Sequence, residues 1–225
     1  MKLIYLVLPA LILGCSGQDE KSVQKLDEEE KNVLYAIGVE ISQQLKVLDL
    51  NQAELAAVKE GFSDNVLQEE LAIDMSVYRG KIQDWGSKRI EAAAARHSQQ
   101  GEEYVKKLLE DPSIAKTVSG ALVEVTKDGT GEQPTGSSKV TIHYHGTLID
   151  GTVFDSSKDR GEPATFALGG LIKCWGEGIP IIKVGGSARL VCPPDTAYGA
   201  TGSPPVIPPN ATLIFDVELI EIVKE

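Results

Sequence analysis

The chain has 225 residues, of which 42% are hydrophobic and 24% charged, so it is long enough for more than one globular domain. Its formal net charge of -11 argues against a nucleic-acid or phosphate-binding role, because proteins of that class usually present a basic face. Both halves of the chain are mildly acidic, which favours solubility rather than the steering of a charged ligand.

Residues 1–15, MKLIYLVLPALILGC, resemble a secretory signal. Lys2 gives a positive start, and residues 3–13 form an apolar run that is too short to span a bilayer comfortably. The ending, ILGC, resembles a bacterial lipobox, in which the cysteine is acylated and becomes the first mature residue. We therefore expect Cys15 to carry a lipid anchor, with residues 16–30 as a polar tether. An ordinary signal peptide with an incidental cysteine, or a buried apolar segment, is the alternative.

The segment that follows the tether shows helical periodicity and almost no strand pattern. A first helix, from about 28 to 46, places its apolar residues on one stripe: Val33, Ile37, Ile41 and Leu45. A second helix begins at a capping box, in which Asn51 is the cap and Glu54 lies three residues later. Two such short helices cannot make a large core alone, so we expect residues 31–73 to pair with a second chain. A monomeric hairpin packed on the C-terminal domain is the alternative.

A third, long helix is predicted within residues 74–118, with Asp74 as its cap. If unbroken from 75 to 110, it would span roughly 54 Å at 1.5 Å per residue. Its apolar stripe thins after Trp85, and Gly86 and Gly101 are weak points that each cost about 1 kcal/mol relative to alanine. The pattern indicates a solvent-exposed spacer.

Residues 119–225 carry the alternation of antiparallel strands. The runs that indicate strands are 121–126, 140–144, 153–154, 188–192 and 212–219. Asp150-Gly151 suits a hairpin turn, and residues 176–180 resemble the end of a short helix. The sequence therefore predicts an α+β fold, in which an all-α part precedes an antiparallel half-barrel sheet with one short helix.

The sequence contains no CxxC, HExxH or GxxxxGK[ST] motif. His143 and His145 lie on one strand face with no obvious third ligand, so we expect no metal and no cofactor.

One ordered set of motifs in the C-terminal part resembles the FKBP-type (macrolide-binding) peptidyl-prolyl cis/trans isomerases. In chain order these motifs are IHYHG, VFDSS, KDRGEP, TFALG, AYGATG, PPVIPP and LIFDVEL. The likeness covers roughly half of the chain and implies the FKBP fold for residues 119–225. YAIGVEISQQL and AELAAVKEGFSDNV further resemble the N-terminal dimerisation domain of Mip-type (macrophage infectivity potentiator) FKBPs, which implies a homodimer.

The resemblance carries the family's pocket onto particular residues of this chain. It implies that the catalytic positions are Asp155, Tyr198, Tyr144 and Phe154. It implies that the substrate-binding positions are Trp175 as the floor, Phe166, Leu171, Ile172, Val206, Ile207, Phe215, and Arg160 as the partner of Asp155. Each has a plainer alternative: the apolar members suit the core of any such sheet, and Asp155 or Arg160 suits a turn or a solvated loop.

The chemistry implied is rotation about X–Pro bonds, whose barrier is about 18–20 kcal/mol. A catalyst must favour the twisted amide over both planar forms and need form no covalent bond. An apolar pocket helps, because the twisted amide is less dipolar than the planar one and loses less on leaving water. A rigid aromatic wall and one or two hydrogen-bond donors complete the requirement.

Three departures from the family pattern bear on ligand preference more than on fold. Ala164 stands where an aromatic residue is usual, which implies a wider pocket on that side. The segment LGGLIKCW is shorter than usual before the tryptophan, and Cys174 replaces the usual glycine.

Apart from Cys15, the chain has only Cys174 and Cys192, an even pair for an oxidising compartment. We expect a disulfide between them. Two buried free thiols, which behave as small hydrophobic groups, are the alternative.

The sequence thus predicts a dimeric prolyl isomerase that acts on unfolded or newly exported polypeptides and does not bind nucleic acid. Its predicted location is the cell envelope, and the resemblance of Ser16 after the cysteine to outer-membrane sorting in enteric-type bacteria implies a lipid in the outer membrane, facing the periplasm. Two other functions remain open: a clamp-like periplasmic chaperone or binding module with a weak or silent pocket, and a surface protein that contacts a host or matrix component.

Overall fold

The structure, a computed structural model, describes residues 25–224. The predicted signal and lipobox at residues 1–15 lie outside them. Among the described residues, the helices are too short or too polar for any of them to cross a membrane. The chain divides into two units, residues 1–40 and residues 41–225, which are taken separately below.

The first unit holds most of helix α1 (Glu28–Ser42). Asp27 begins the helix by accepting a hydrogen bond from the Glu30 backbone, while the Glu30 carboxylate accepts one from the Asp27 backbone. Acidic residues in the first turn also suit the helix dipole. No residue of α1 is buried, and Val33 and Ile37 of its apolar stripe are 55% and 50% exposed. The helix is shorter than predicted, because the chain tightens into a 3-10 helix after Ser42.

The second unit begins with the 3-10 helix η1 (Gln43–Leu48) and helix α2 (Gln52–Leu67). The predicted capping box is confirmed: the Asn51 side chain accepts from the Glu54 backbone, and the Glu54 carboxylate accepts from the Asn51 backbone at 2.8 Å. Arg89 of the third helix holds the end of η1 and the start of α2 in place, because it donates hydrogen bonds to Glu54 at 2.9 Å and to the carbonyl oxygen of Leu48 at 2.9 Å.

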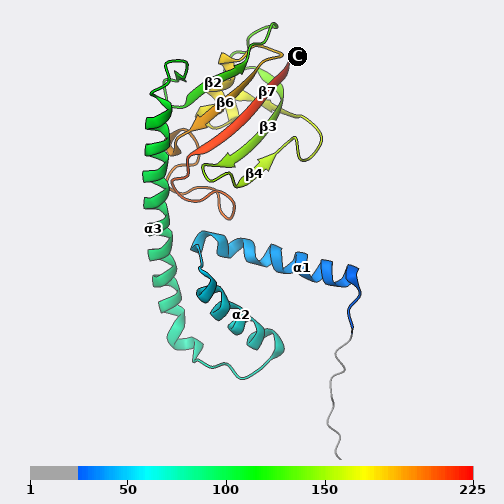
Figure 1. Cartoon of the computed structure of the whole chain (residues 1–225), viewed down its shortest axis with the longest axis vertical. Coiled ribbons are helices and arrows are strands. Elements are labelled where there is room, and N and C mark those ends of the chain that lie inside the picture. The colour runs from blue at the N-terminus through cyan, green and yellow to red at the C-terminus, as the bar shows by residue number, and fades with distance from the viewer. Residues whose placement is uncertain (1–24, 225) are drawn as a thin grey trace, which may run out of the picture. The chain divides into compact units, whose positions relative to one another are not determined.

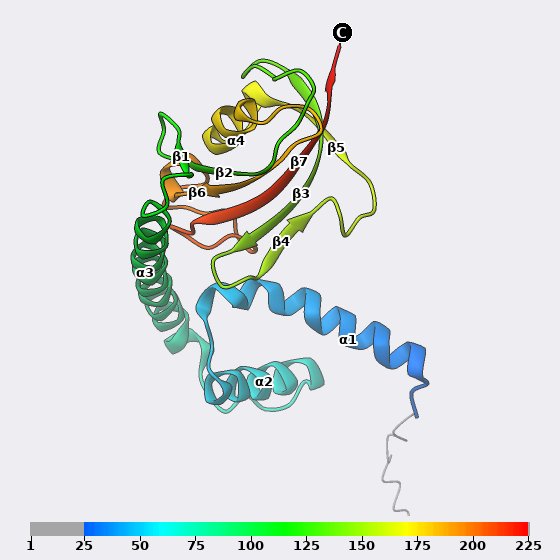
Figure 2. The same ribbon diagram turned by 45° about the horizontal axis from the view of Figure 1, so that its top comes forward.

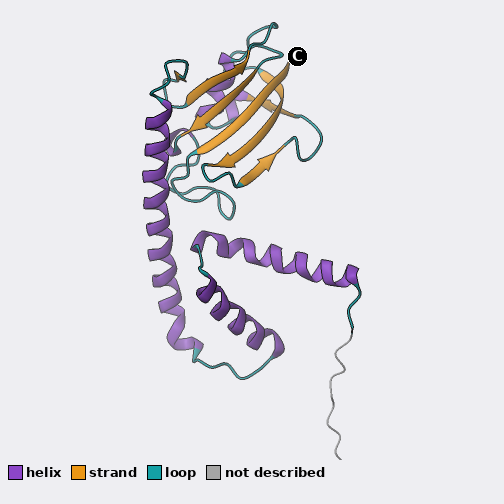
Figure 3. Cartoon of the chain, in the orientation of Figure 1, coloured by secondary structure: helices purple, strands orange, loops and turns teal. Residues whose placement is uncertain are grey.

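The long helix α3 (Met75–Leu108) is confirmed, with Asp74 as its cap, and it continues without a break through Gly86 and Gly101 (Figure 3). The prediction that it is a solvent-exposed spacer does not hold for one face of its second half. Ala93 and Gly101 are buried, and at Gly101 the helix lies against Thr212, in the loop before the last strand. The His97 ring nitrogen Nδ1 also lies 3.2 Å from the carbonyl oxygen of Pro209.

The remainder forms one antiparallel sheet of order β1-β2-β6-β7-β3-β4, with β5 paired to β3 (Figure 1). The strands are β1 (Ala115–Lys116), β2 (Leu122–Lys127), β3 (Lys139–Leu148), β4 (Val153–Ser156), β5 (Ala164–Ala167), β6 (Ser187–Cys192) and β7 (Leu213–Val223). The helical pieces between them are η2 (Leu168–Gly170), α4 (Lys173–Gly178), η3 (Ile179–Ile181) and η4 (Pro194–Thr196). The predicted α+β fold, an antiparallel sheet with one short α-helix after an all-α part, is confirmed.

The core lies between the concave face of this curved sheet and α4 (Figure 2). In β7, Leu213, Phe215, Val217 and Leu219 are buried while the residues between them are less so, which is the alternation expected of a strand with one covered face. Ile179, which follows α4, is fully buried against them. The sheet and α4 therefore hold the side chains that border the site in one rigid body.

Candidate active site

A pocket of about 370 Å³ opens at the edge of this core. Its lining is Tyr144, Phe154, Asp155, Phe166, Leu171, Ile172, Trp175, Tyr198, Ser203, Pro204, Val206, Ile207 and Phe215. The structure thus brings together every pocket residue expected from the sequence except Arg160, which stands just outside the lining and bonds to it. Ser203 and Pro204 were not predicted, although they lie in the same GSPPVIPP segment as Val206.

Trp175 is the centre of the pocket's aromatic lining. Its ring packs edge-on against Tyr144 at 5.2 Å, Phe166 at 5.6 Å and Phe215 at 5.0 Å between ring centroids. Only 5% of Trp175 is exposed. Edge-on aromatic packing fixes each ring relative to the others. The pocket floor is therefore a rigid apolar surface.

Phe154 completes this wall because Gly146 of β3 leaves room for it. The Phe154 ring packs edge-on against Phe215 at 5.3 Å. A Cβ at position 146 would lie 2.7 Å from the Phe154 ring, so a side chain there would displace it. The glycine of IHYHG thus has a steric function that the motif alone does not reveal.

One side of the pocket is polar and tightly bonded. The Tyr144 hydroxyl donates to Asp155 Oδ2 at 2.5 Å, and Arg160 donates both to Asp155 Oδ1 at 2.5 Å and to the Tyr144 hydroxyl at 2.8 Å. Arg160 also lies over the Tyr144 ring. A planar guanidinium that serves two acceptors at once holds both in a fixed geometry. The Asp155 carboxylate is therefore charged, paired and fixed at the edge of an apolar cavity.

This bonding determines the protonation of the cluster. Burial alone would raise the pKa of Asp155, but the hydrogen bonds from Tyr144 and Arg160 and the guanidinium charge outweigh it, and the net pKa is lowered. Burial, together with the bond to Asp155, raises the pKa of the Tyr144 hydroxyl. The same bonds raise the pKa of Arg160. At neutral pH the cluster therefore holds a carboxylate, a neutral phenol and a guanidinium.

Ser157, which sequence reasoning did not single out, fixes the backbone of Tyr144. Its side chain is fully buried, accepts from the Tyr144 amide at 2.8 Å and lies 3.1 Å from His143 Nδ1. His145 Nδ1 lies 3.0 Å from the Ser156 hydroxyl. The two histidines are thus engaged in hydrogen bonds to serines, and the described residues hold no group of three side chains suited to a metal ion.

The loop between β6 and β7 forms the outer edge of the pocket. The Asn210 amide donates to the Gly199 carbonyl at 3.0 Å and closes the loop's base, and Ser203 and Ile207 exchange two backbone bonds at 2.9 Å near its tip. Ile207 is buried, whereas Tyr198 and Val206 are 43% and 45% exposed. Because the loop is pinned at base and tip, Tyr198 and Val206 border the mouth of the pocket at defined positions. We call residues 198–210 the flap.

Cys174 and Cys192, the pair expected from the sequence, are joined by a disulfide with Cα atoms 5.5 Å apart. The bridge links the start of α4 to the end of β6, directly beside Trp175. Ala164 lies on β5 and packs against the core, outside the pocket lining.

Comparison with known proteins agrees with this geometry over most of the chain. The model of the FKBP-type peptidyl-prolyl cis-trans isomerase family matches residues 130–220, and the model of the domain amino-terminal to such isomerases matches residues 30–125. FkpA from Escherichia coli K12, an FKBP-type isomerase, is 35% identical over 220 residues, which cover 92% of this chain and 80% of that protein. A probable FkpA from Neisseria meningitidis serogroup B is 37% identical over 197 residues, covering 84% and 72% of the two chains.

A solved structure extends the likeness to three dimensions. The crystal structure of FkpA from Escherichia coli superposes with a TM-score of 0.63 at 34% identity, covering 87% of this chain and 97% of that one. Sequence, family models and architecture agree across both the helical part and the sheet. The chain therefore belongs to the FKBP-type peptidyl-prolyl cis–trans isomerases.

Proposed function

We propose that this chain catalyses cis–trans isomerisation of X–Pro bonds in unfolded, newly exported polypeptides, and that the pocket around Trp175 is where it does so. The observation that carries the proposal is the fixed Asp155–Tyr144–Arg160 cluster beside an aromatic floor. The floor accepts the prolyl ring, and the flap residues Val206 and Ile207 overhang it.

Catalysis follows from stabilising the twisted amide relative to both planar forms. The apolar walls favour the twisted amide, which is less dipolar than the planar one. The Asp155 carboxylate at the edge of the pocket stabilises the positive charge that develops on the amide carbonyl carbon as resonance is lost. The Tyr198 hydroxyl holds the substrate carbonyl, Phe154 supports the wall, and no bond to the enzyme forms.

A direct test uses the chain from residue 16 with Cys15 removed, and a proline-containing tetrapeptide. The double variant Asp155→Ala/Tyr198→Phe should lower kcat/KM by at least about tenfold, because hydrogen bonds to charged groups contribute about 1.5–3 kcal/mol and 1.4 kcal/mol is a factor of ten. Asp159→Ala, which removes an exposed carboxylate four residues away, is the matched control. Equal activity in the double variant and the control would contradict the assignment of the site.

We further propose that two copies pair through residues 31–73, with residues 74–118 joining this domain to an isomerase domain at 119–225. Exposed apolar side chains in the helices support this, since Ile37, Phe62 and Val66 are 50%, 52% and 57% exposed. Apolar surface of that extent is typical of a face covered by a partner. A second copy of the same chain is the simplest partner for such a helical domain.

We also propose that Cys15 is acylated and holds the protein at the periplasmic face of the outer membrane. The ILGC sequence, the polar segment after it and the Cys174–Cys192 disulfide, which suits an oxidising compartment, support this location. Metabolic labelling with a fatty acid should mark the wild-type protein and leave Cys15→Ser unmarked. Equal labelling of both would contradict acylation at Cys15.

A further inference from the structure

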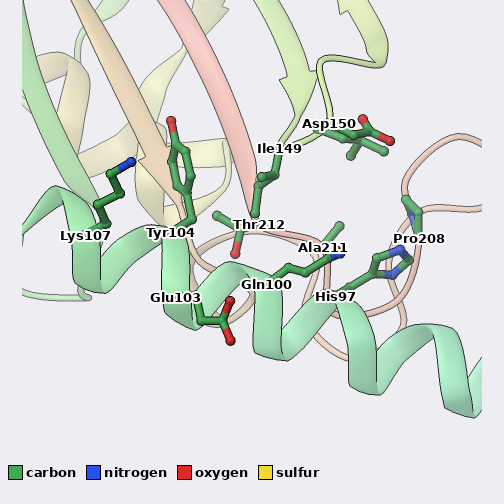
Figure 4. Close-up of a pocket in the computed structure, with 11 residues that line it drawn as sticks. His97, Gln100, Glu103, Tyr104, Lys107, Ile149, Asp150, Pro208, Ala211 and Thr212 are labelled. Carbon is green, nitrogen blue, oxygen red and sulfur yellow. The ribbon is translucent and has the colours of Figure 1, made fainter.

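A crevice runs along the second half of α3, outside the isomerase pocket. It consists of two cavities of about 350 and 440 Å³, which share the lining residues His97, Gln100, Leu148, Asp150 and Pro208. Figure 4 shows the larger cavity, with side chains of α3 facing the turn that joins β3 to β4. We call these two cavities together the α3 crevice.

The α3 crevice adjoins the isomerase pocket through the flap. Pro204, Val206 and Ile207 line both the smaller cavity of the crevice and the isomerase pocket. The isomerase pocket, the smaller cavity and the larger cavity therefore follow one another. The flap is the wall between the isomerase pocket and the smaller cavity. A chain that leaves the isomerase pocket and crosses the flap enters the crevice directly.

The lining of the crevice suits an extended polypeptide. Leu148, Ile149 and Tyr104 supply apolar surface, while Gln100 supplies an amide that can both donate and accept. Apolar walls with a few polar groups that donate and accept match the side chains and backbone of a peptide.

The charges of the crevice argue against a small charged ligand. In the larger cavity Lys107 and Glu103 lie on α3 and Asp150 lies on the opposite wall (Figure 4), and the smaller cavity adds Lys46, Arg96 and Asp49. Charges of both signs give no net attraction for an anion or a cation. Recognition must therefore depend on shape and hydrogen bonds, as it does for a polypeptide of mixed composition.

We propose that the α3 crevice is an accessory polypeptide-binding site that holds the part of a substrate flanking the proline in the isomerase pocket. The proposal rests on the proposed function of that pocket. Each extended residue spans about 3.3 Å, so a dodecapeptide reaches roughly 26 Å further than a tetrapeptide. On this proposal a tetrapeptide is held in the isomerase pocket alone, whereas a longer chain occupies both sites, and the second contact raises its effective concentration at the first.

The test compares substrate lengths with one blocking variant. Gln100→Trp fills the crevice at a residue that both of its cavities share, and Gln99→Trp places the same side chain on the neighbouring position of α3, outside the lining. The substrates are a tetrapeptide and two dodecapeptides with the same X–Pro bond, extended on either its N- or its C-terminal side. Gln100→Trp should raise KM for one dodecapeptide by about threefold to tenfold, the range of one or two lost hydrogen bonds. Gln100→Trp should leave kcat unchanged, and it should leave KM for the tetrapeptide unchanged. Gln99→Trp should change neither kcat nor KM for any of the three substrates.

A second measurement covers the case in which the bulky variant folds poorly. A benzoylphenylalanine at position 100 should cross-link to the favoured dodecapeptide on irradiation, and one at position 99 should not. The accessory site would be overturned if the ratio of dodecapeptide turnover to tetrapeptide turnover were the same in Gln100→Trp and Gln99→Trp. It would also be overturned if no cross-link formed at position 100. Absence of tetrapeptide turnover in the wild type would instead overturn the proposed function of the isomerase pocket.

Discussion

Gly101 of α3 and Thr212, the residue before β7, meet so closely that a Cβ built on the glycine would lie 2.3 Å from the threonine hydroxyl oxygen. Real Cβ atoms do not approach another heavy atom to that distance. The Thr212 side chain therefore packs directly against the α3 backbone at Gly101. A glycine that costs helix stability in isolation is here the residue that lets α3 dock.

The first prediction concerns this contact. Gly101→Ala should lower the stability of docking by about 1–3 kcal/mol through overpacking, in spite of alanine's better helix propensity. Gly80→Ala, where nothing lies within 4 Å of the added Cβ, should gain up to about 1 kcal/mol. Thermal unfolding of both variants measures the difference. Shifts of the same sign and size would mean that the Gly101–Thr212 contact does not constrain the helix.

The second prediction concerns Arg160, which bonds to Asp155 and Tyr144 together. Arg160→Met should lower kcat/KM for a tetrapeptide by about tenfold, since both acceptors lose a charged donor. Arg160→Lys should restore only part of the activity, because an ammonium lacks the planar fork. Lys158→Met, an exposed neighbour, serves as the control. Full activity in Arg160→Met would show that the cluster does not need its guanidinium.

The third prediction concerns pH. The pKa of Asp155 is lowered in the folded protein, so its charged form contributes stability above the usual aspartate pKa of about 3.9 and loses it as pH falls through the folded value. Activity should therefore be level from about pH 5 to 8 and decline only below about pH 4. Asp155→Asn should lack that acidic decline. A decline centred near pH 6 would show that another group controls the pocket.

Local patterns in the sequence were enough to predict most of the fold. The period-two alternation of residues 212–219 predicted β7, and the Asn51–Glu54 spacing predicted the start of α2. Both features depend on residues close together in the chain, so a local pattern is enough to predict them. The ordered aromatic and charged motifs indicated which residues would meet in the pocket. Their contacts, such as Trp175 with Phe215, required the sheet to be in place.

Contacts between distant segments were beyond the sequence. Gly101 looked like an exposed position, since small residues leave no apolar stripe, yet its small size is what permits docking against Thr212. Ser157 was visible only as part of VFDSS. Its hydrogen bond to the Tyr144 amide depends on the turn after β4, which no periodicity encodes.

The fourth prediction concerns the Cys174–Cys192 disulfide, which spans 18 residues. Closing a loop of this size contributes about 3 kcal/mol in the chain-entropy model. A reductant should lower the denaturation midpoint of the protein and should not affect Cys174→Ser/Cys192→Ser. Because the bridge adjoins Trp175, the fluorescence of that residue should change on reduction. Two thiols that alkylate without a reductant would contradict the bridge.

The fifth prediction concerns assembly. Val33 and Ile37 form an exposed apolar stripe on α1, and a glutamate on this stripe would meet a second copy as an unpaired charge. Ile37→Glu should therefore yield monomers by light scattering at micromolar concentration, whereas Asn32→Glu, which adds the same charge off the stripe, should leave a dimer. Monomers of Ile37→Glu should retain tetrapeptide turnover, since the pocket residues all come from the sheet, α4 and the loops that join them. A wild-type protein that is monomeric at the same concentration would exclude pairing through residues 31–73. If Ile37→Glu loses tetrapeptide turnover as well as dimerisation, the partner contributes to the isomerase site.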